Sequence, residues 1–320
     1  MNDNIKKINR IENDSSFPLI YDNQLQNNNF NYIEWLNKNY SKILNELSTY
    51  GAILFKNFKI NDILSFDKFI SSFKLPNFPY KESLSNAVRL NRTERIFTAN
   101  EAPCDISIDL HHELAQTPIY PSKLFFYCEK AADSGGYTPI CRSDILFERL
   151  TSRIPDFIKN CIQKGVRYTH VMPPRMDSQS GQGRNWKSTL SVSGKLEAEE
   201  KLNKLNYKWT WLDDDYLEVT TPVLSSVKKM KDGRKVFFNQ IIAAFNGWDR
   251  KNNNKNKPVC FGDLSQINKK DIEIANNIIN DIVYDIKWQN GDIAMINNFF
   301  IMHGRRSFRG SRSILASLIK

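Results

Sequence analysis

Three of the four histidines in this chain of 320 residues lie in two short segments whose spacing suits metal binding. His111 and Glu113 are two residues apart, and side chains two apart in a strand point to the same face. His303, far along the chain, could bring a second imidazole to that face. Two imidazoles and one carboxylate on one side of a metal form the ligand set of non-haem Fe(II) oxygenases, which leaves positions open for substrates.

The spacing of these three residues is also compatible with different roles. His111 could be a hydrogen-bonded core histidine beside a capping acid, and two histidines with a glutamate also bind catalytic zinc in hydrolases. A binding protein without catalytic activity is a third interpretation. The neighbouring segments favour a metal site, because residues 109–111 alternate polar and apolar side chains like a half-buried strand, and residues 296–303 read as a strand and a turn.

The composition is typical of a globular enzyme. Hydrophobic residues make up 41% and aromatic residues 12% of the chain. No apolar run approaches the ~18 residues of a transmembrane helix, and residues 1–14 contain no apolar stretch of the signal-peptide type. We therefore expect a cytoplasmic protein that has no membrane partner.

Charge and cysteine content exclude further classes of function. The net charge is +10, but the lysines are scattered among asparagines, as in residues 251–257, which predict a solvated loop. No nucleic-acid-binding motif accompanies this charge, so we expect no nucleic-acid partner. The five cysteines form no C-x-x-C pair, which indicates reduced packing residues and not a zinc ribbon.

Sequence periodicity predicts many short strands and a few helices. We expect helices at residues 32–47, 60–73, 143–154 (with Ser143 as N-cap) and 195–205. Strands are expected at residues 51–55, 86–97 (two strands and a turn), 124–128, 207–211, 217–220, 236–239, 285–289, 292–296 and 313–318. Residues 1–30 are predicted to be an irregular lead-in, and the loop 172–188 to be a lid or binding element.

This order of elements predicts the fold class. Without an internal repeat or an evident linker, residues 1–320 are interpreted as one domain. The predicted class is α+β and mainly β, with a double-stranded β-helix (jelly-roll) core and flanking helices.

The motifs together resemble the taurine dioxygenase (TauD/TfdA-like) superfamily of Fe(II)- and 2-oxoglutarate-dependent oxygenases. Within it, the branch with the syringomycin-pathway aspartyl hydroxylase and the clavaminate-synthase-like proteins is the most similar. The resemblance covers most of the chain, and the metal strand and the C-terminal histidine segment are its most specific parts. The matching segments, in the family's order, are 50–58 (YGAILFKNF), 97–103 (FTANEAP), 110–114 (LHHEL), 120–126, 135–140, 237–240 (FFNQ), 288–292 (WQNGD) and 303–305 (HGR).

The resemblance implies that His111, Glu113 and His303 bind Fe(II), with 2-oxoglutarate and O₂ as co-substrates. It assigns Arg312 to the distal carboxylate of 2-oxoglutarate, since a planar guanidinium makes two hydrogen bonds to a carboxylate. The hydroxyl of Thr138 would bind the same carboxylate. Alternatively, Arg312 is a surface arginine and Thr138 an ordinary turn residue. The competing arginines are Arg305, Arg306 and Arg309.

The chain departs from the family pattern at two places. Relatives often carry two consecutive arginines where this chain has Arg312 and Ser313. They usually carry Asp-Asn where this chain has Asn297 and Asn298, a change expected to affect support of the distal strand and not the metal.

The reaction implied by the resemblance is hydroxylation of an unactivated C–H bond in a small molecule, with desaturation or cyclisation as alternatives. The branch suggests an amino acid, free or tethered to a carrier protein, in specialised metabolism. Glu113 occupies the position that halogenases of the superfamily leave open for chloride, so we do not expect halogenation. Candidate substrate residues are Ser107, Asn239 and Arg305, together with the loop 172–188.

Overall fold

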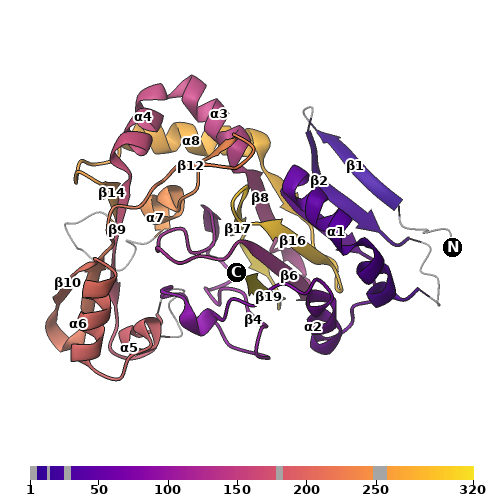
Figure 1. Ribbon diagram of the computed structural model, residues 1–320, viewed down its shortest axis with the longest axis horizontal. Helices are drawn as coiled ribbons and strands as arrows, with labels where there is room; N and C mark the ends of the chain where they lie inside the picture. The colour runs from indigo at the N-terminus through magenta and orange to yellow at the C-terminus, as the bar shows by residue number, and fades with distance from the viewer. Residues whose placement is uncertain (1–5, 13–14, 25–29, 178–182, 248–257) are drawn as a thin grey trace.

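The computed structural model describes residues 6–12, 15–24, 30–177, 183–247 and 258–320 (Figure 1). The asparagine-rich residues 27–29, the centre of the predicted loop 172–188 and the predicted solvated loop 251–257 lie outside the described residues.

Two sheets form the centre of the molecule. The larger sheet has seven strands in the order β1 (Lys6–Glu12), β2 (Ser15–Asp22), β3 (Ala52–Lys56), β16 (Ile293–Asn297), β6 (Lys123–Lys130), β19 (Ser313–Ile319) and β4 (Phe97–Thr98). The smaller sheet has four strands in the order β15 (Tyr284–Ile286), β8 (Thr138–Arg142), β17 (Ile301–Arg305) and β5 (Ile108–His111). Neighbouring strands are antiparallel except β2 and β3, which run parallel.

Apolar residues of the larger sheet cover both of its faces, which explains the nearly continuous apolar runs in its strands. Leu54, Phe126 and Ala294 face the smaller sheet and share one core cluster with its Ile140 and Ile286. The residues that alternate with them, Ile53, Phe125 and Ile293, belong to a second cluster on the opposite face. The two facing sheets are the predicted double-stranded β-helix.

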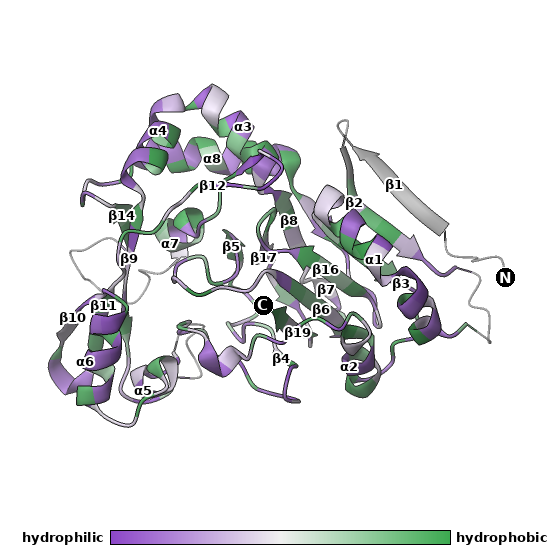
Figure 2. Ribbon diagram, viewed as in Figure 1, coloured by the Kyte–Doolittle hydropathy of each residue, from purple (hydrophilic) through white to green (hydrophobic). Residues whose placement is uncertain are grey.

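Helices cover the outer faces of both sheets, with apolar residues turned inward and polar residues outward (Figures 1 and 2). The larger sheet is covered by α1 (Tyr32–Tyr50) and α2 (Ile63–Ser71). The smaller sheet is covered by α3 (Ser143–Arg153), α4 (Pro155–Lys164), α7 (Ile241–Gly247) and α8 (Lys269–Ile282). The sequence did not predict α4, α7 or α8. Within the described ranges, none of the helices is long and apolar enough to cross a membrane.

A third group of elements packs around its own small core. Its sheet has the order β10 (Lys208–Trp211), β11 (Leu217–Thr220), β9 (Val166–Met172) and β14 (Val259–Phe261), beside helices α5 (Trp186–Leu190) and α6 (Lys195–Lys204). The remaining short elements are the pairs β7 (Ser134–Gly135) with β18 (Phe308–Arg309) and β12 (Lys228–Lys229) with β13 (Lys235–Val236), and the 3₁₀ turns η1 (Tyr80–Glu82) and η2 (Asp213–Asp215).

Several local expectations are wrong. The predicted lead-in contains strand β1 as well as β2, and of the predicted strand 236–239 only Val236 lies in a strand, β13. Residues 15–22 are not an irregular lead-in but strand β2, whose buried Leu19 and Tyr21 join the core of the larger sheet. Residues 86–96 form no strand pair, and only Phe97 and Thr98 join a sheet. Ser143 is the first residue of α3 and not its N-cap, because its hydroxyl donates to the carbonyl oxygens of the β16–β17 turn.

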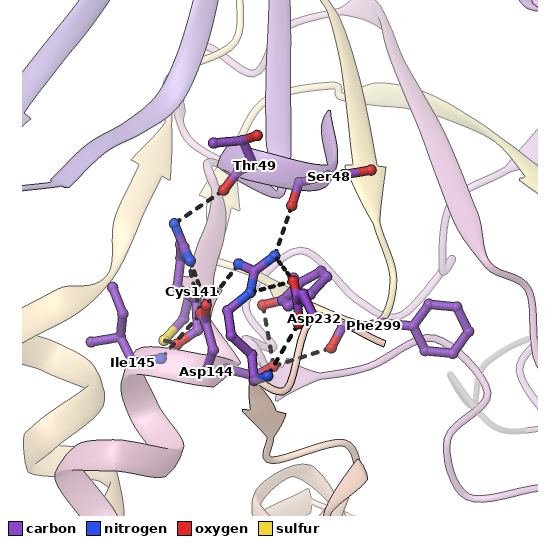
Figure 3. Close-up of polar contacts among 11 residues, drawn as sticks. Ser48, Thr49, Cys141, Asp144, Ile145, Asp232 and Phe299 are labelled. Carbon is purple, nitrogen blue, oxygen red and sulfur yellow. Dashed lines mark hydrogen bonds and ion pairs between the residues drawn. The ribbon is translucent and has the colours of Figure 1, made fainter. Parts of the chain in front are cut away.

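Buried Asp144, on the first turn of α3, binds two arginines close to the turn between β16 and β17 (Figure 3). Its carboxylate accepts hydrogen bonds from the side chains of Arg142 and Arg234. Arg234 also donates to the carbonyl oxygen of Ser48 at the end of α1, and its guanidinium lies 3.9 Å from the ring of Phe300. This network fixes the entry of β17 into the smaller sheet.

We expect Asp144→Asn to lower the free energy of unfolding by about 1–3 kcal/mol, because it removes the buried charge that two arginines share. Chemical denaturation of the metal-free protein measures this change. Asp232→Asn is the matched control, because Asp232 pairs with Arg234 at an exposed position. This substitution should lower the free energy of unfolding by about 1 kcal/mol or less. Equal losses in the two variants would contradict a special role for Asp144.

Candidate active site

Strand pairing brings the two histidine segments together. β17 runs antiparallel to β5 with His303 opposite His111, and the two imidazole rings are 4.6 Å apart. Gly304 permits this approach, because a Cβ atom there would lie 2.4 Å from the carbonyl oxygen of Ile108. Glu113 follows β5 by two residues and turns its carboxylate toward the same point.

The three side chains offer one donor atom each to a single ion. Their candidate ligand atoms all lie within 4.8 Å of one another, and His303 Nε2 is 3.4 Å from Glu113 Oε2. His111 Nδ1 donates to the carbonyl oxygen of Asp109 at 2.8 Å, which leaves the lone pair of Nε2 free for a metal. The donor set fits Fe(II), and the three residues form its facial triad.

Electrostatics keeps these ligands in the protonation states that a metal needs. Burial, helped by the neighbouring His303, lowers the pKa of His111 to about 4, so its imidazole is neutral at pH 7. Burial alone would raise the pKa of Glu113, but Arg89 and the two histidines outweigh it and hold that pKa well below its usual range. A neutral imidazole and an ionised carboxylate are both ready to coordinate.

Buried Asn298, in the turn before β17, holds the main chain at Glu113. Its Oδ1 accepts from the Glu113 N–H at 2.8 Å, and its Nδ2 donates to the carbonyl oxygens of Glu113 and Pro121. Its own carbonyl oxygen pairs with Nδ1 of His112, which faces away from the triad. Asn298 therefore supports the metal ligand itself. The side chain of its neighbour Asn297 accepts from the Phe299 N–H within the turn.

A cavity of about 850 Å³, including its open mouth, lies over the triad. Such a volume suits a small molecule. Its lining residues are Ser85, Asn86, Ala87, Arg89, Ala99, Asn100, Ile108, His111, Glu113, Gln116, Phe126, Thr138, Gln240, Ala243, His303, Gly304, Arg305, Arg312 and Ile314.

Arg312 and Thr138, the two predicted 2-oxoglutarate residues, meet on one wall of this cavity. Arg312 donates through Nε to the Gly136 carbonyl oxygen at 2.9 Å and through Nη2 to Thr138 Oγ1 at 3.4 Å. Thr138 Oγ1 also accepts from Trp288 Nε1, so its own proton is available for a ligand oxygen. Burial lowers the pKa of Arg312 to about 10, and among the described residues no carboxylate neutralises this cation.

The competing arginines have other partners or other positions. Arg306 pairs with Asp285, and Arg309 lies in β18 outside the cavity lining. Ser313, where relatives often carry a second arginine, points away from the cavity and donates to Glu129. Arg312 directly precedes β19, and its side chain and that of Ile314 line the cavity, whereas that of Ser313 between them does not.

The three predicted substrate residues are not brought together. Arg305 lines the cavity, but its guanidinium donates to four carbonyl oxygens of residues 100–106 and so ties that loop to β17. Ser107 is exposed, is not part of the lining and accepts from Ser307 N–H. Asn239 is fully buried behind the wall and donates to the Ser226 carbonyl oxygen. The adjacent Gln240 is the residue that reaches the cavity.

Sequence reasoning missed several cavity residues. Arg89 forms a buried ion pair with Glu113, and the amide side chains of Asn86 and Gln116 also line the cavity. Arg184, in the described part of the predicted lid loop, donates to the carbonyl oxygens of Ser83 and Ser85 and so fastens that loop to the wall. The one feature of the sequence that could have indicated these residues is that they lie near the metal strand or in the long loop along the chain.

We expect Asn298→Ala to lower the free energy of unfolding by about 3 kcal/mol, because it leaves polar groups of the buried main chain unpaired. It should also weaken Mn(II) binding about 10- to 100-fold, as loss of support for a metal ligand does. Isothermal titration calorimetry and chemical denaturation test both effects. Asn297→Ala is the control and should change the Mn(II) affinity less than about twofold; equal effects would refute the assignment.

The metal-free protein should lose stability as the pH falls from about 6.5 to about 4. Burial lowers the pKa values of His111 and His170 to about 4 and that of His112 to about 3, from an ordinary 6.5. In this window the unfolded chain binds protons that the folded chain does not, which favours unfolding. The thermal midpoint, measured at pH 7.5, 6.5 and 5.5, should fall at each step below neutrality. A constant midpoint would contradict the burial of neutral imidazoles.

Comparisons with known proteins agree with this geometry. Residues 20–318 match the taurine catabolism dioxygenase TauD, TfdA family. A clavaminate synthase-like protein of Arabidopsis thaliana is 36% identical over 271 residues, covering 84% of this chain and 82% of that protein. The dapdiamide synthesis protein DdaC of Enterobacter agglomerans is 25% identical over 289 residues, covering 85% and 83%.

Solved structures show the same fold at low sequence identity. PvcB of Pseudomonas aeruginosa has a TM-score of 0.57 at 10% identity, covering 100% of this chain and 92% of that one. AAD-2, in a complex with Mn(II) and N-oxalylglycine, has a TM-score of 0.50 at 13% identity, covering 98% and 97%. With the facial triad of His111, Glu113 and His303 in place, the chain belongs to the TauD/TfdA family of Fe(II)- and 2-oxoglutarate-dependent oxygenases.

Proposed function

We propose that this oxygenase hydroxylates an unactivated C–H bond of an amino acid, free or tethered to a carrier protein, in specialised metabolism. The observation that carries the proposal is that one cavity contains both the triad and Arg312, which has no carboxylate partner among the described residues and lies beside the Thr138 hydroxyl. One relative is named for dapdiamide synthesis and another as clavaminate synthase-like, which supports a biosynthetic role. The resemblance to the syringomycin-pathway aspartyl hydroxylase supports an amino acid.

Arg312 and Thr138 are proposed to bind the distal carboxylate of 2-oxoglutarate. The guanidinium is already oriented by Gly136 and Thr138, so a carboxylate would meet a fixed donor. Phe126 and Ile314 line the same cavity and suit the methylene groups of the keto acid. The wall therefore matches a small dicarboxylate whose other end reaches the metal.

When bound together, Fe(II) and 2-oxoglutarate supply the oxidising chemistry, in which O₂ is consumed, 2-oxoglutarate becomes succinate and CO₂, and one oxygen atom enters the substrate. The chain contributes position and protection from water. His111, Glu113 and His303 would hold the ion, and all three line the cavity in which the substrate would bind. Glu113 also occupies the position at which a halide would otherwise bind, which supports hydroxylation over halogenation.

Amide side chains supply the uncharged polar part of the substrate wall. Asn86, Gln116 and Gln240 line the cavity and can donate to a carboxylate or accept from an amine. An amino acid carries both groups, which supports this substrate class. We place the substrate against these amides and the keto acid against Arg312.

The direct test is to incubate the Fe(II)-loaded protein aerobically with 2-oxoglutarate, chloride and a panel of free and carrier-bound amino acids. We expect succinate, and one substrate that gains the mass of one oxygen atom. Arg312→Lys should raise the KM for 2-oxoglutarate about 10- to 100-fold, because a lysine cannot bind the carboxylate through two hydrogen bonds. Arg306→Lys is the control, since Arg306 pairs with Asp285.

Different products would identify the alternatives. Loss of two hydrogen atoms from the substrate indicates desaturation or cyclisation, and a chlorinated product contradicts the proposed role of Glu113. Substrate hydrolysis without 2-oxoglutarate indicates a zinc enzyme. A folded, metal-loaded protein that produces no succinate with any substrate, coupled or uncoupled, would be an inactive binding protein.

A further inference from the structure

Arg89 is a buried cation placed directly against the metal-binding carboxylate. Its Nη2 donates to Glu113 Oε1 at 2.8 Å and to Oε2 at 3.0 Å. Only 7% of the Arg89 side chain and 3% of the Glu113 side chain are exposed. Arg89 also lines the cavity, so this ion pair forms part of its wall.

The guanidinium is held in place from the side away from Glu113. Its Cζ lies 4.8 Å from the centre of the Tyr80 ring and 5.3 Å from that of Phe97. The next residue, Leu90, exchanges hydrogen bonds with Thr98 of β4, which pairs with β19. These contacts position the guanidinium of Arg89 beside Glu113.

The two oxygens of Glu113 have different neighbours. Oε2 lies 3.4 Å from His303 Nε2, on the side where the triad converges. Arg89 Nη2 donates to both oxygens, at 2.8 Å to Oε1 and at 3.0 Å to Oε2, so what distinguishes Oε2 is its additional contact with His303. If an ion takes Oε2, Oε1 keeps the shorter of the two bonds to the arginine.

This geometry matters because an octahedral ion has six positions. Two histidines and a carboxylate bound through both oxygens would take four, and 2-oxoglutarate would take the remaining two. No position would then be left for O₂. We propose that Arg89 is a positioning residue that holds Glu113 Oε1, so that Glu113 binds iron through Oε2 alone and leaves a position for O₂.

The inference rests on the proposed function, but its test separates the two. Mn(II) affinity, measured by calorimetry, and crystal structures of the Mn(II) complexes need no turnover. Arg89→Met keeps the approximate volume and removes the charge and the donors. We expect its Kd for Mn(II) to rise about 10- to 100-fold, and Glu113 to bind Mn(II) through both oxygens in its crystal structure.

Arg92→Met is the matched control, because Arg92 lies on the same segment and pairs with Glu129 at a partly exposed position. It should leave the Kd within twofold of the wild type and Glu113 bound through one oxygen. Arg89→Lys keeps the charge but not the planar fork. We expect Arg89→Lys to weaken Mn(II) binding several-fold. If Arg89→Met does not fold, Arg89→Lys is the variant that tests the inference.

The inference is overturned if a folded Arg89→Met, or Arg89→Lys in its place, binds Mn(II) as tightly as the wild type with Glu113 still bound through one oxygen. A wild-type protein that does not bind Mn(II) or Fe(II) would instead refute the proposed function. Uncoupled succinate formation gives a further readout. It should fall in Arg89→Met even when metal and 2-oxoglutarate are saturating, and it should be unchanged in Arg92→Met.

Discussion

The pairing of β17 with β5 is the contact on which the site depends. It sets His303 opposite His111, and a shift of one residue would turn His303 to the other face of the sheet. Gly304 makes the close approach of the two strands possible, and the Asp144 network fixes the turn from which β17 starts. The metal site therefore depends on the register of β17 against β5. The larger sheet contributes by packing against the smaller sheet in a shared core.

A group of buried polar side chains is costly unless every member has a partner. Here Asn298 accepts from the main-chain N–H of Glu113, and the carbonyl oxygen of Asp109 fixes the ring of His111. Arg89 compensates the charge of the Glu113 carboxylate. Arg89 Nε and Nη1 and His303 Nδ1 have no hydrogen-bond partner among the described residues, but the ligand atoms of the triad already converge on one point. Binding a metal then requires little reorganisation, because the ligands are preorganised.

We propose that the cavity serves two kinds of recognition. On one wall, Arg312 is a fixed cation without a carboxylate partner among the described residues, which suits an anionic co-substrate. Elsewhere the lining offers amide groups of Asn86, Gln116 and Gln240, which can adapt to donors or acceptors. The first wall fits a shared co-substrate of the family, and the second is the place where specificity for a particular small molecule would arise.

The sequence predicted the parts of the structure that local patterns encode. The spacing of His111 and Glu113 indicated correctly that they act together, although β5 ends at His111 and Glu113 lies in the turn that follows, so strand alternation does not place it. The order of motifs indicated the jelly-roll and His303. Strand β2 was missed because its short apolar run contains Pro18 and follows a polar N-terminus. Residues 86–96 look like strands, but the main-chain N–H of Arg184 and the hydroxyl of Thr98 satisfy part of their backbone.

Contacts between distant segments were beyond such patterns. Nothing near Arg89 in the sequence indicates that it pairs with Glu113, since only the folded chain brings them together. The sequence also does not indicate that Gln240, and not Asn239, reaches the cavity. The local turn into α7 determines this.

The most direct test of the central claim is to titrate the anaerobic protein first with Fe(II) and then with 2-oxoglutarate while recording the visible absorption spectrum. If the triad holds the ion beside the keto acid, a weak charge-transfer band should appear in the green only after both are present, and His303→Ala should abolish it. A wild-type spectrum that stays unchanged after both additions, or a His303→Ala variant that develops the same band, would contradict the account.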